Sequence, residues 1–136
     1  MNNEVIFNKI ESLRKCLVRI KEKTPADYET LLEDYDLQDI ICLNLERAVQ
    51  NSVDIATSLI AETDSPAPDT MRNAFEILAK SQYTSRKTAV KMQNAVGFRN
   101  IAVHTYQDID WAIVYKIITE HLDDFKLFIE EILKHD

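Results

Sequence analysis

The sequence predicts an all-α protein, folded as an antiparallel up-and-down bundle of four to five helices. The chain of 136 residues contains one Gly and three Pro, whereas β architectures rich in hairpins need Gly at their turns. Hydrophobic residues make up 46% of the chain, enough to build a folded core. Apolar residues also recur every three or four positions, the period of a helix with one buried face. We expect one folded domain over residues 1–136.

The first two long helices are predicted from their apolar stripes. A helix over residues 3–23 presents such a stripe and ends at Thr24-Pro25, because Pro disfavours a helical conformation in the residue before it. A longer helix is predicted over residues 36–61, with Asp36 as its N-cap. Its apolar face is wide, which indicates contact with two neighbours.

Three further helices complete the predicted bundle. The proline-containing segment 63–69 separates the long helix from a helix over residues 70–80. The next is expected over 85–97, ending at Gly97 because glycine commonly terminates helices. The last is expected over 108–134. Short connections between these helices favour an antiparallel bundle.

Several classes of protein do not match the sequence. The N-terminal residues are too polar for a signal peptide, and no window reaches the ~18 consecutive apolar residues of a membrane span. Cys16 and Cys42 have no Cys or His at metal-ligand spacing, so we expect reduced thiols, no metal and no cofactor in a cytoplasmic protein. One Gly also excludes the glycine-rich nucleotide-binding motifs.

The charge is unevenly distributed along the chain. The formal net charge is −7, yet residues 77–107 contain no Asp or Glu. Lysines and arginines in this segment could neutralise the phosphates of RNA. Charge alone favours the alternative, a solvated helix face that happens to be basic. The candidates for contact with the RNA backbone are Lys80, Arg86, Lys87 and Lys91. No DNA or membrane partner is expected.

The basic segment ends in the sequence GFRNIAVHTY, residues 97–106. A histidine with an ordinary pKa can exchange protons near neutral pH, and arginine offers a planar set of donors to phosphate oxygens. His104 and Arg99 therefore suit RNA cleavage without a metal, because the 2′-hydroxyl of RNA is the nucleophile. Asn100 lies four positions before His104 and so shares its helix face. Alternatively, the Arg caps a helix and the His fills a turn.

This motif resembles the Arg-x4-His-x-Tyr motif of HepT-type proteins, a toxin branch of the HEPN superfamily. The stretch KMQNAVGFRNIAVHTY that ends at Tyr106, the helix LQDIICLNLERAVQNSVDIATSLI and the closing segment HLDDFKLFIEEI are all similar to that family. The resemblance covers essentially the whole chain. It implies an all-α homodimer in which two motifs form one composite ribonuclease site.

The resemblance also implies roles for individual residues. His104 would be the general acid and base, Arg99 the group that binds phosphate and the transition state, and Asn100 a supporting polar residue. An MntA-like nucleotidyltransferase antitoxin would transfer AMP from ATP to Tyr106 and so block the site. The alternative is a non-catalytic subunit that binds or presents a substrate to the nucleotidyltransferase.

The sequence leaves the partner of Arg99 open. A buried guanidinium requires a compensating partner, and Glu46 and Asp54 are candidates. Both could equally be exposed.

Overall fold

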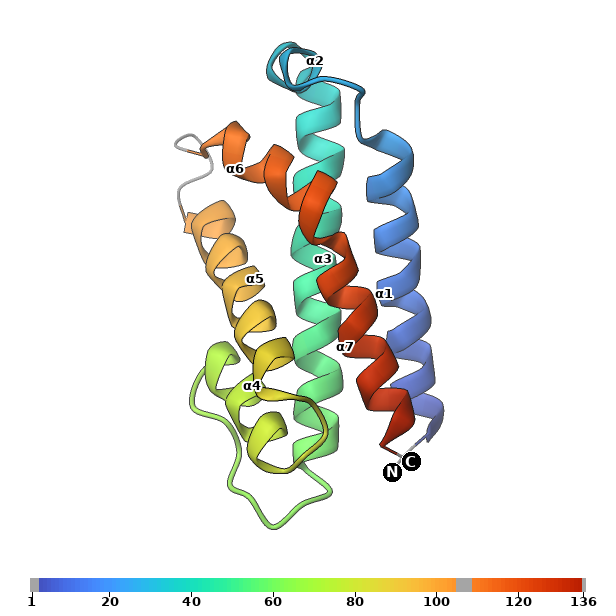
Figure 1. Cartoon of the computed structure of the whole chain (residues 1–136), viewed down its shortest axis with the longest axis vertical. Coiled ribbons are helices and arrows are strands. Elements are labelled where there is room, and N and C mark those ends of the chain that lie inside the picture. Colours follow the sequence, from blue (N-terminus) through green and yellow to red (C-terminus); the bar gives the residue numbers. More distant parts are fainter. Residues whose placement is uncertain (1–2, 105–108, 136) are drawn as a thin grey trace.

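The computed structural model describes residues 3–104 and 109–135. Four long helices run alternately up and down, so that α1 begins at the end of the bundle where α7 ends (Figure 1). They are α1 (Asn3–Lys23), α3 (Tyr35–Ile60), α5 (Arg86–His104) and α7 (Leu122–Lys134). This arrangement confirms the predicted antiparallel all-α bundle.

Shorter elements complete the chain at the two ends of the bundle (Figure 1). They are α2 (Tyr28–Glu33), α4 (Met71–Lys80), α6 (Trp111–Lys116) and the π-helical segment η2 (Ile117–His121). The sequence did not predict α2. This six-residue helix is too short to show an apolar period.

The predicted boundaries of the first helices are close to those observed. Helix α1 covers residues 3–23, as predicted. Helix α3 begins at Tyr35, one residue before the predicted range. Its N-cap is Asp34 and not the predicted Asp36: the Asp34 side chain accepts a hydrogen bond from the Leu37 N–H at 3.1 Å. Thr70 caps α4 in the same way, accepting from the Asn73 N–H at 3.0 Å. These side chains satisfy N–H groups that a helix start leaves unpaired.

The predicted end of the fourth helix at Gly97 is wrong. Helix α5 continues through Gly97 to His104, and Gly97 does not have the positive φ of a helix-ending glycine. Its neighbours Val96 and Phe98 are both buried, so packing keeps this turn helical. A Cβ atom on Gly97 would lie 2.6 Å from Nη2 of Arg72. The glycine therefore permits a close approach of the Arg72 side chain.

The predicted final helix is divided into three parts. Helix α6 begins at Trp111 after its N-cap Asp110, whose side chain accepts from the Ala112 N–H at 3.0 Å. The π-helical turns of η2 then separate α6 from α7. A π-helical segment inserts an extra residue into a helix. In Figure 1, α6 crosses obliquely over one end of the bundle while α7 runs along it.

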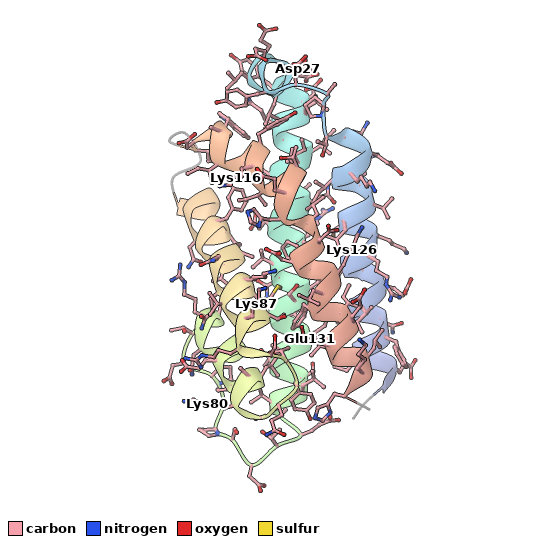
Figure 2. The ribbon with its side chains drawn as sticks, viewed as in Figure 1. Asp27, Lys80, Lys87, Lys116, Lys126 and Glu131 are labelled. Atoms are coloured by element: carbon pink, nitrogen blue, oxygen red, sulfur yellow. The ribbon has the colours of Figure 1, made fainter. Side chains whose placement is uncertain are left out.

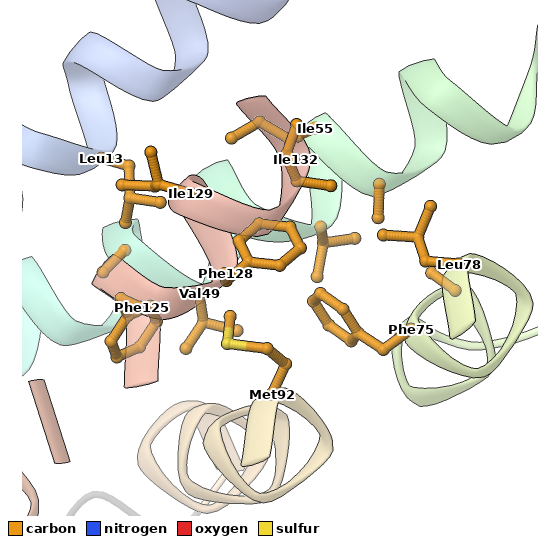
Figure 3. Close-up of a cluster of buried hydrophobic side chains, with 14 of the residues drawn as sticks. Leu13, Val49, Ile55, Phe75, Leu78, Met92, Phe125, Phe128, Ile129 and Ile132 are labelled. Carbon is orange, nitrogen blue, oxygen red and sulfur yellow. The ribbon is translucent and has the colours of Figure 1, made fainter. Parts of the chain in front are cut away.

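The main hydrophobic core lies between α1, α3, α4, α5 and α7 (Figure 3). Phe75 of α4 and Phe128 of α7 meet edge to face at its centre, with ring centroids 5.6 Å apart. A second cluster lies nearer α2 and α6 and includes Phe98 of α5, together with Ile41 and Val114. Phe98 thus anchors the second half of α5, which carries the predicted functional motif, to α3 and α6.

Within the described ranges, no helix combines the length and the apolar character that crossing a membrane requires. Cys16 and Cys42 are buried free cysteines. Burial, and then the negative charges of Asp39 and Glu46, raise the pKa of Cys42 to about 12. Burial also raises the pKa of Cys16. Both thiols are therefore protonated at neutral pH.

Candidate functional site

Arg99 projects from α5 onto the neighbouring helix α3. Its Nη2 atom donates a hydrogen bond to Oε1 of Gln50, at 3.3 Å. The side chain is half-buried, and its Nε atom is buried without a hydrogen-bond partner in the part of the chain that the structure describes. A guanidinium has five N–H donors. The contact with Gln50 fixes one end of the group and uses one of these donors.

A second layer of polar contacts holds Gln50. Its Nε2 atom donates to Oδ1 of Asp54, one helical turn further along α3, at 3.0 Å. The other oxygen of Asp54, Oδ2, accepts from Lys9 Nζ of α1, also at 3.0 Å. The contacts therefore run from α5 through α3 to α1.

Neither predicted carboxylate partner forms an ion pair with Arg99 among the described residues. Asp54 reaches Arg99 only through Gln50, and its own ion pair is with Lys9. Glu46 is half-buried and makes no ion pair with Arg99. The partner that the structure shows is a neutral amide.

The other motif residues follow Arg99 along α5. Asn100 is exposed, and His104 is the last residue of the helix, with its side chain outside the described part of the structure. Positions four apart on an α-helix lie about 40° apart around the axis, whereas positions five apart lie about 140° apart. Positions 100 and 104 therefore share a face, and position 99 lies on another. Tyr106 lies outside the described residues.

The four predicted RNA-backbone candidates have different surroundings. Lys80 is exposed and lies 3.6 Å from Glu76, and Lys91 lies 3.6 Å from Asp124. Arg86 and Lys87 are exposed at the start of α5 and have no ion pair within residues 3–104 and 109–135.

Figure 2 shows Lys80 and Lys87 near the α4 end of the bundle. With a rise of 1.5 Å per residue, Lys87 lies about 18 Å along α5 from Arg99. A polyanion bound at Arg99 would therefore have to extend along the helix to contact these cations.

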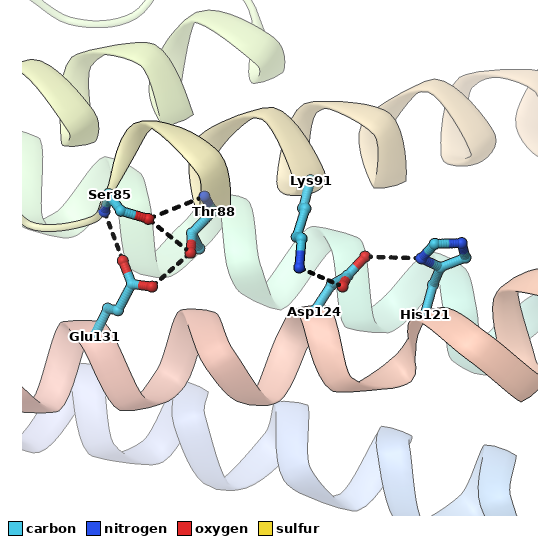
Figure 4. A network of polar contacts seen from close by, with 6 residues as sticks. All are labelled: Ser85, Thr88, Lys91, His121, Asp124 and Glu131. Carbon is cyan, nitrogen blue, oxygen red and sulfur yellow. Dashed lines mark hydrogen bonds and ion pairs between the residues drawn. The ribbon is translucent and has the colours of Figure 1, made fainter.

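Two networks of polar contacts hold α5 against α7 (Figure 4). In the first, the Ser85 N–H donates to Oε1 of Glu131 at 2.6 Å, and the Thr88 hydroxyl donates to the other carboxylate oxygen. Thr88 is fully buried, and its N–H donates to Oγ of Ser85, which caps the helix. This network fixes the start of α5 on α7.

The second network centres on Asp124 of α7. One of its oxygens lies 3.6 Å from Lys91 Nζ, and the other lies 3.2 Å from Nδ1 of His121, the last residue of η2. The carboxylate is largely shielded from solvent, with 15% of the side chain exposed. Lys91 is thus part of a contact between helices.

Gln50 was not among the residues that the sequence predicted for the site. It lies one helical turn from both Glu46 and Asp54, so all three share a face of α3. That periodicity could have indicated Gln50, but the partner expected for a buried guanidinium is a carboxylate. Across the described ranges, no group of three or more His, Cys, Asp or Glu side chains could hold a metal ion.

The structure is an antiparallel all-α bundle in which the Arg99–His104 motif occupies the last turns of α5. Comparison with known proteins identifies the family to which this bundle belongs. The family model described as "Ribonuclease HepT-like" matches residues 13–132, and the chain belongs to this family. The resemblance stated from the sequence is confirmed.

Two relatives and one solved structure show how far the similarity extends. The chain is 34% identical to the mRNA nuclease HepT of Shewanella oneidensis over 96% of this chain and 97% of the relative. It is 26% identical to the tRNA nuclease HepT of Aphanizomenon flos-aquae over 94% of this chain and 87% of the relative. A solved structure of the tri-AMPylated Shewanella oneidensis HEPN toxin in complex with MNT antitoxin matches all of both chains, with a TM-score of 0.90 and 33% identity.

Proposed function

We propose that this chain is a metal-independent endoribonuclease toxin that a cognate MntA-like nucleotidyltransferase neutralises by transferring AMP to Tyr106. The observation that carries the proposal is the Arg-x4-His pair on α5, in a chain that belongs to the ribonuclease HepT-like family. Two relatives are nucleases named for mRNA and tRNA, so RNA is the proposed substrate class. An RNA substrate also favours action in the cytoplasm.

The proposed reaction is transesterification within the RNA. His104 removes the proton of a 2′-hydroxyl, and the 2′-oxygen attacks the adjacent phosphorus. The bond from phosphorus to the 5′-oxygen breaks, and an imidazolium donates the proton that this oxygen needs to leave. The products are a 2′,3′-cyclic phosphate and a 5′-hydroxyl. Arg99 stabilises the negative charge that accumulates on the phosphoryl oxygens, while Asn100 supports His104 from the same helix face.

A homodimer supplies the second histidine in this proposal. Positions 99 and 104 diverge by about 140° around α5, and Arg99 is held on the side of α3. Position 104 of the same copy therefore lies on a different face of the helix. Two copies of the chain with their α5 ends together would bring a histidine and an arginine from each copy to one phosphate. One His104 then acts as the base and the other as the acid.

In this proposal, the charge and the size of the AMP group on Tyr106 neutralise the toxin. The Tyr106 oxygen attacks the α-phosphorus of ATP, giving Tyr-AMP and pyrophosphate. The added phosphate lies two residues from His104, in a site whose cations are placed for the phosphate of RNA. It would compete for Arg99 and obstruct RNA. The tri-AMPylated relative in complex with its antitoxin supports this part of the proposal.

Cleavage of total cellular RNA in EDTA tests the proposed function. The protein is purified without its antitoxin, and its intact mass establishes that it carries no AMP. We expect the wild type to cut RNA and leave cyclic phosphate ends, and His104→Ala to lose cleavage while keeping its thermal unfolding midpoint. His121→Ala is the matched control, because His121 belongs to the Asp124 contact on α7 and should leave cleavage unchanged.

Three results would contradict this function. Cleavage that survives His104→Ala, or that requires an added metal, would place the chemistry elsewhere. If the unmodified wild type also fails to cut RNA, the protein is the non-catalytic subunit that binds the nucleotidyltransferase.

A further inference from the structure

We propose that Gln50 is a positioning residue for Arg99: a neutral hydrogen-bond acceptor that holds the guanidinium in place without compensating its charge. The inference rests on the proposed function, in which Arg99 acts on the phosphate. Its basis is the continuous set of contacts from Arg99 through Gln50 and Asp54 to Lys9.

The contacts on both sides of Gln50 fix which way its amide faces. Asp54 accepts only, so the amide presents its Nε2 donor to Asp54. The carbonyl oxygen Oε1 is then left for Arg99, which donates only. Turning the amide over would place donor against donor and oxygen against carboxylate. Asp54 therefore orients Gln50, and Lys9 holds Asp54 in turn.

The neutrality of Gln50 matters for phosphate binding. A carboxylate at this position would form a bidentate pair with the guanidinium and offset its positive charge. An amide restricts the orientation of the side chain but leaves the full charge for an anion. The buried Nε of Arg99 has no hydrogen-bond partner among the described residues, so Gln50 is the polar contact that the described structure provides for this side chain.

Single-turnover cleavage of a synthetic RNA is the first test, with the RNA chosen from a cut site mapped in total cellular RNA. Gln50→Ala should lower the saturating rate about tenfold or more, the range expected for a hydrogen bond to a charged group. The RNA concentration for half-saturation should stay within about twofold, because a loss of orientation acts mainly on the transition state. Gln50→Glu should also be slow, since its charge would compensate Arg99.

The matched control is Gln93→Ala. Gln93 lies on α5 and donates to the Arg72 carbonyl at 3.0 Å, so this variant removes a glutamine hydrogen bond that is distant from the Arg99 contact. It should leave the cleavage rate unchanged. The thermal unfolding midpoints of all variants establish that each one is folded.

A second measurement reads the side chain of Arg99 directly. In ¹⁵N-labelled protein, the Nε–Hε resonance of Arg99 is assigned by its disappearance in Arg99→Lys, and its ¹⁵N relaxation reports how ordered the guanidinium is. We expect an ordered signal in the wild type and in Gln93→Ala, and faster motion in Gln50→Ala. A purely structural role for Gln50 would not change the order of this one side chain.

The outcomes separate this inference from the proposed function. If Arg99→Ala cleaves RNA normally, Arg99 has no role and both proposals are overturned. If Arg99→Ala is inactive but Gln50→Ala retains the wild-type rate and an ordered Arg99 signal, the positioning role is wrong and the ribonuclease proposal stands. Full activity in Gln50→Glu would overturn the argument from neutrality.

Discussion

The polar contact between Glu131 and the start of α5 leads to a stability prediction. Glu131 accepts from the Ser85 N–H and from the hydroxyl of Thr88, which is fully buried. Glu131→Ala removes both hydrogen bonds at the point where α5 begins. The start of α5 then loses its polar contacts with α7, while the Lys91–Asp124 contact further along the helix remains.

The expected magnitude follows from the two hydrogen bonds that the substitution removes. A hydrogen bond to a charged group contributes about 1.5–3 kcal/mol. The Thr88 hydroxyl keeps Ser85 Oγ as a neighbour at 3.0 Å, and Glu131 is only half-buried, so the full sum is reduced. We expect a decrease of about 2–4 kcal/mol in the free energy of unfolding. For a chain of this length, that corresponds to a fall in Tm of about 7–14 °C.

Urea and thermal unfolding followed by circular dichroism, at one fixed protein concentration, measure this decrease. The adjacent Glu130 is exposed, and Glu130→Ala should stay within about 0.5 kcal/mol of the wild type. A double-mutant cycle with Thr88→Val should show coupling, because both variants remove the same hydrogen bond. If Glu131→Ala and Glu130→Ala unfold at the same urea concentration, the contact does not stabilise the bundle and the reasoning is refuted.

Two further predictions concern Gly97 and Cys42. Gly97→Ala should raise the free energy of unfolding by up to about 1 kcal/mol, because alanine is favoured over glycine in a helix interior. The new Cβ atom would meet the end of the Arg72 side chain, which is flexible and exposed and can move away. Urea unfolding measures the change, and a loss of stability would show that Arg72 cannot move. Because burial and the charges of Asp39 and Glu46 raise the pKa of Cys42 to about 12, very little thiolate is present at pH 8, and native protein should react slowly with iodoacetamide there and faster as the pH is raised. Mass spectrometry of the labelled peptide measures the rate, and labelling at pH 8 as fast as in urea would contradict the raised pKa.

Periodicity predicted the helices with a long apolar stripe and failed where a local signal competed with packing. The prediction for α1 was correct over residues 3–23. At Gly97, the preference of glycine for helix ends favoured a stop, but a mid-helix glycine costs only about 1 kcal/mol. Burial of Val96 and Phe98 outweighs that cost and keeps α5 helical. The sequence alone does not distinguish a glycine that ends a helix from one that lies inside it.

The π-helical segment was outside the reach of a period-based prediction. Residues 117–121 continue the apolar pattern of the last helix, so the sequence favoured one uninterrupted element. The different course of α6 and α7 follows from how each packs: Val114 and Ile118 join the second cluster, whereas Phe125 and Phe128 join the main core. The division of this stretch between two hydrophobic clusters depends on tertiary contacts, which the local apolar pattern does not predict.

The candidate site divides in the same way between local and distant information. The Arg-x4-His motif is local, and the sequence predicted it together with its family. The partner of Arg99 is not local: Gln50 lies on another helix, 49 positions earlier in the chain. The expectation of a carboxylate followed from the general rule for buried charges. That rule describes arginines that stabilise a fold, and it need not apply to a half-buried arginine for which phosphate binding is proposed.

The partners of the cations therefore separate two uses of positive charge that look alike in the sequence. Lys80 and Lys91 lie beside carboxylates, on their own helix and on α7 respectively, so part of their charge is already compensated within the protein. Arg99 lies beside an amide and keeps its charge available. Residues 77–107 contain no acidic side chain, so any carboxylate that compensates this segment must come from elsewhere in the fold. At Arg99 the neighbouring helix supplies Gln50, and this choice of residue leaves the motif able to bind an anion.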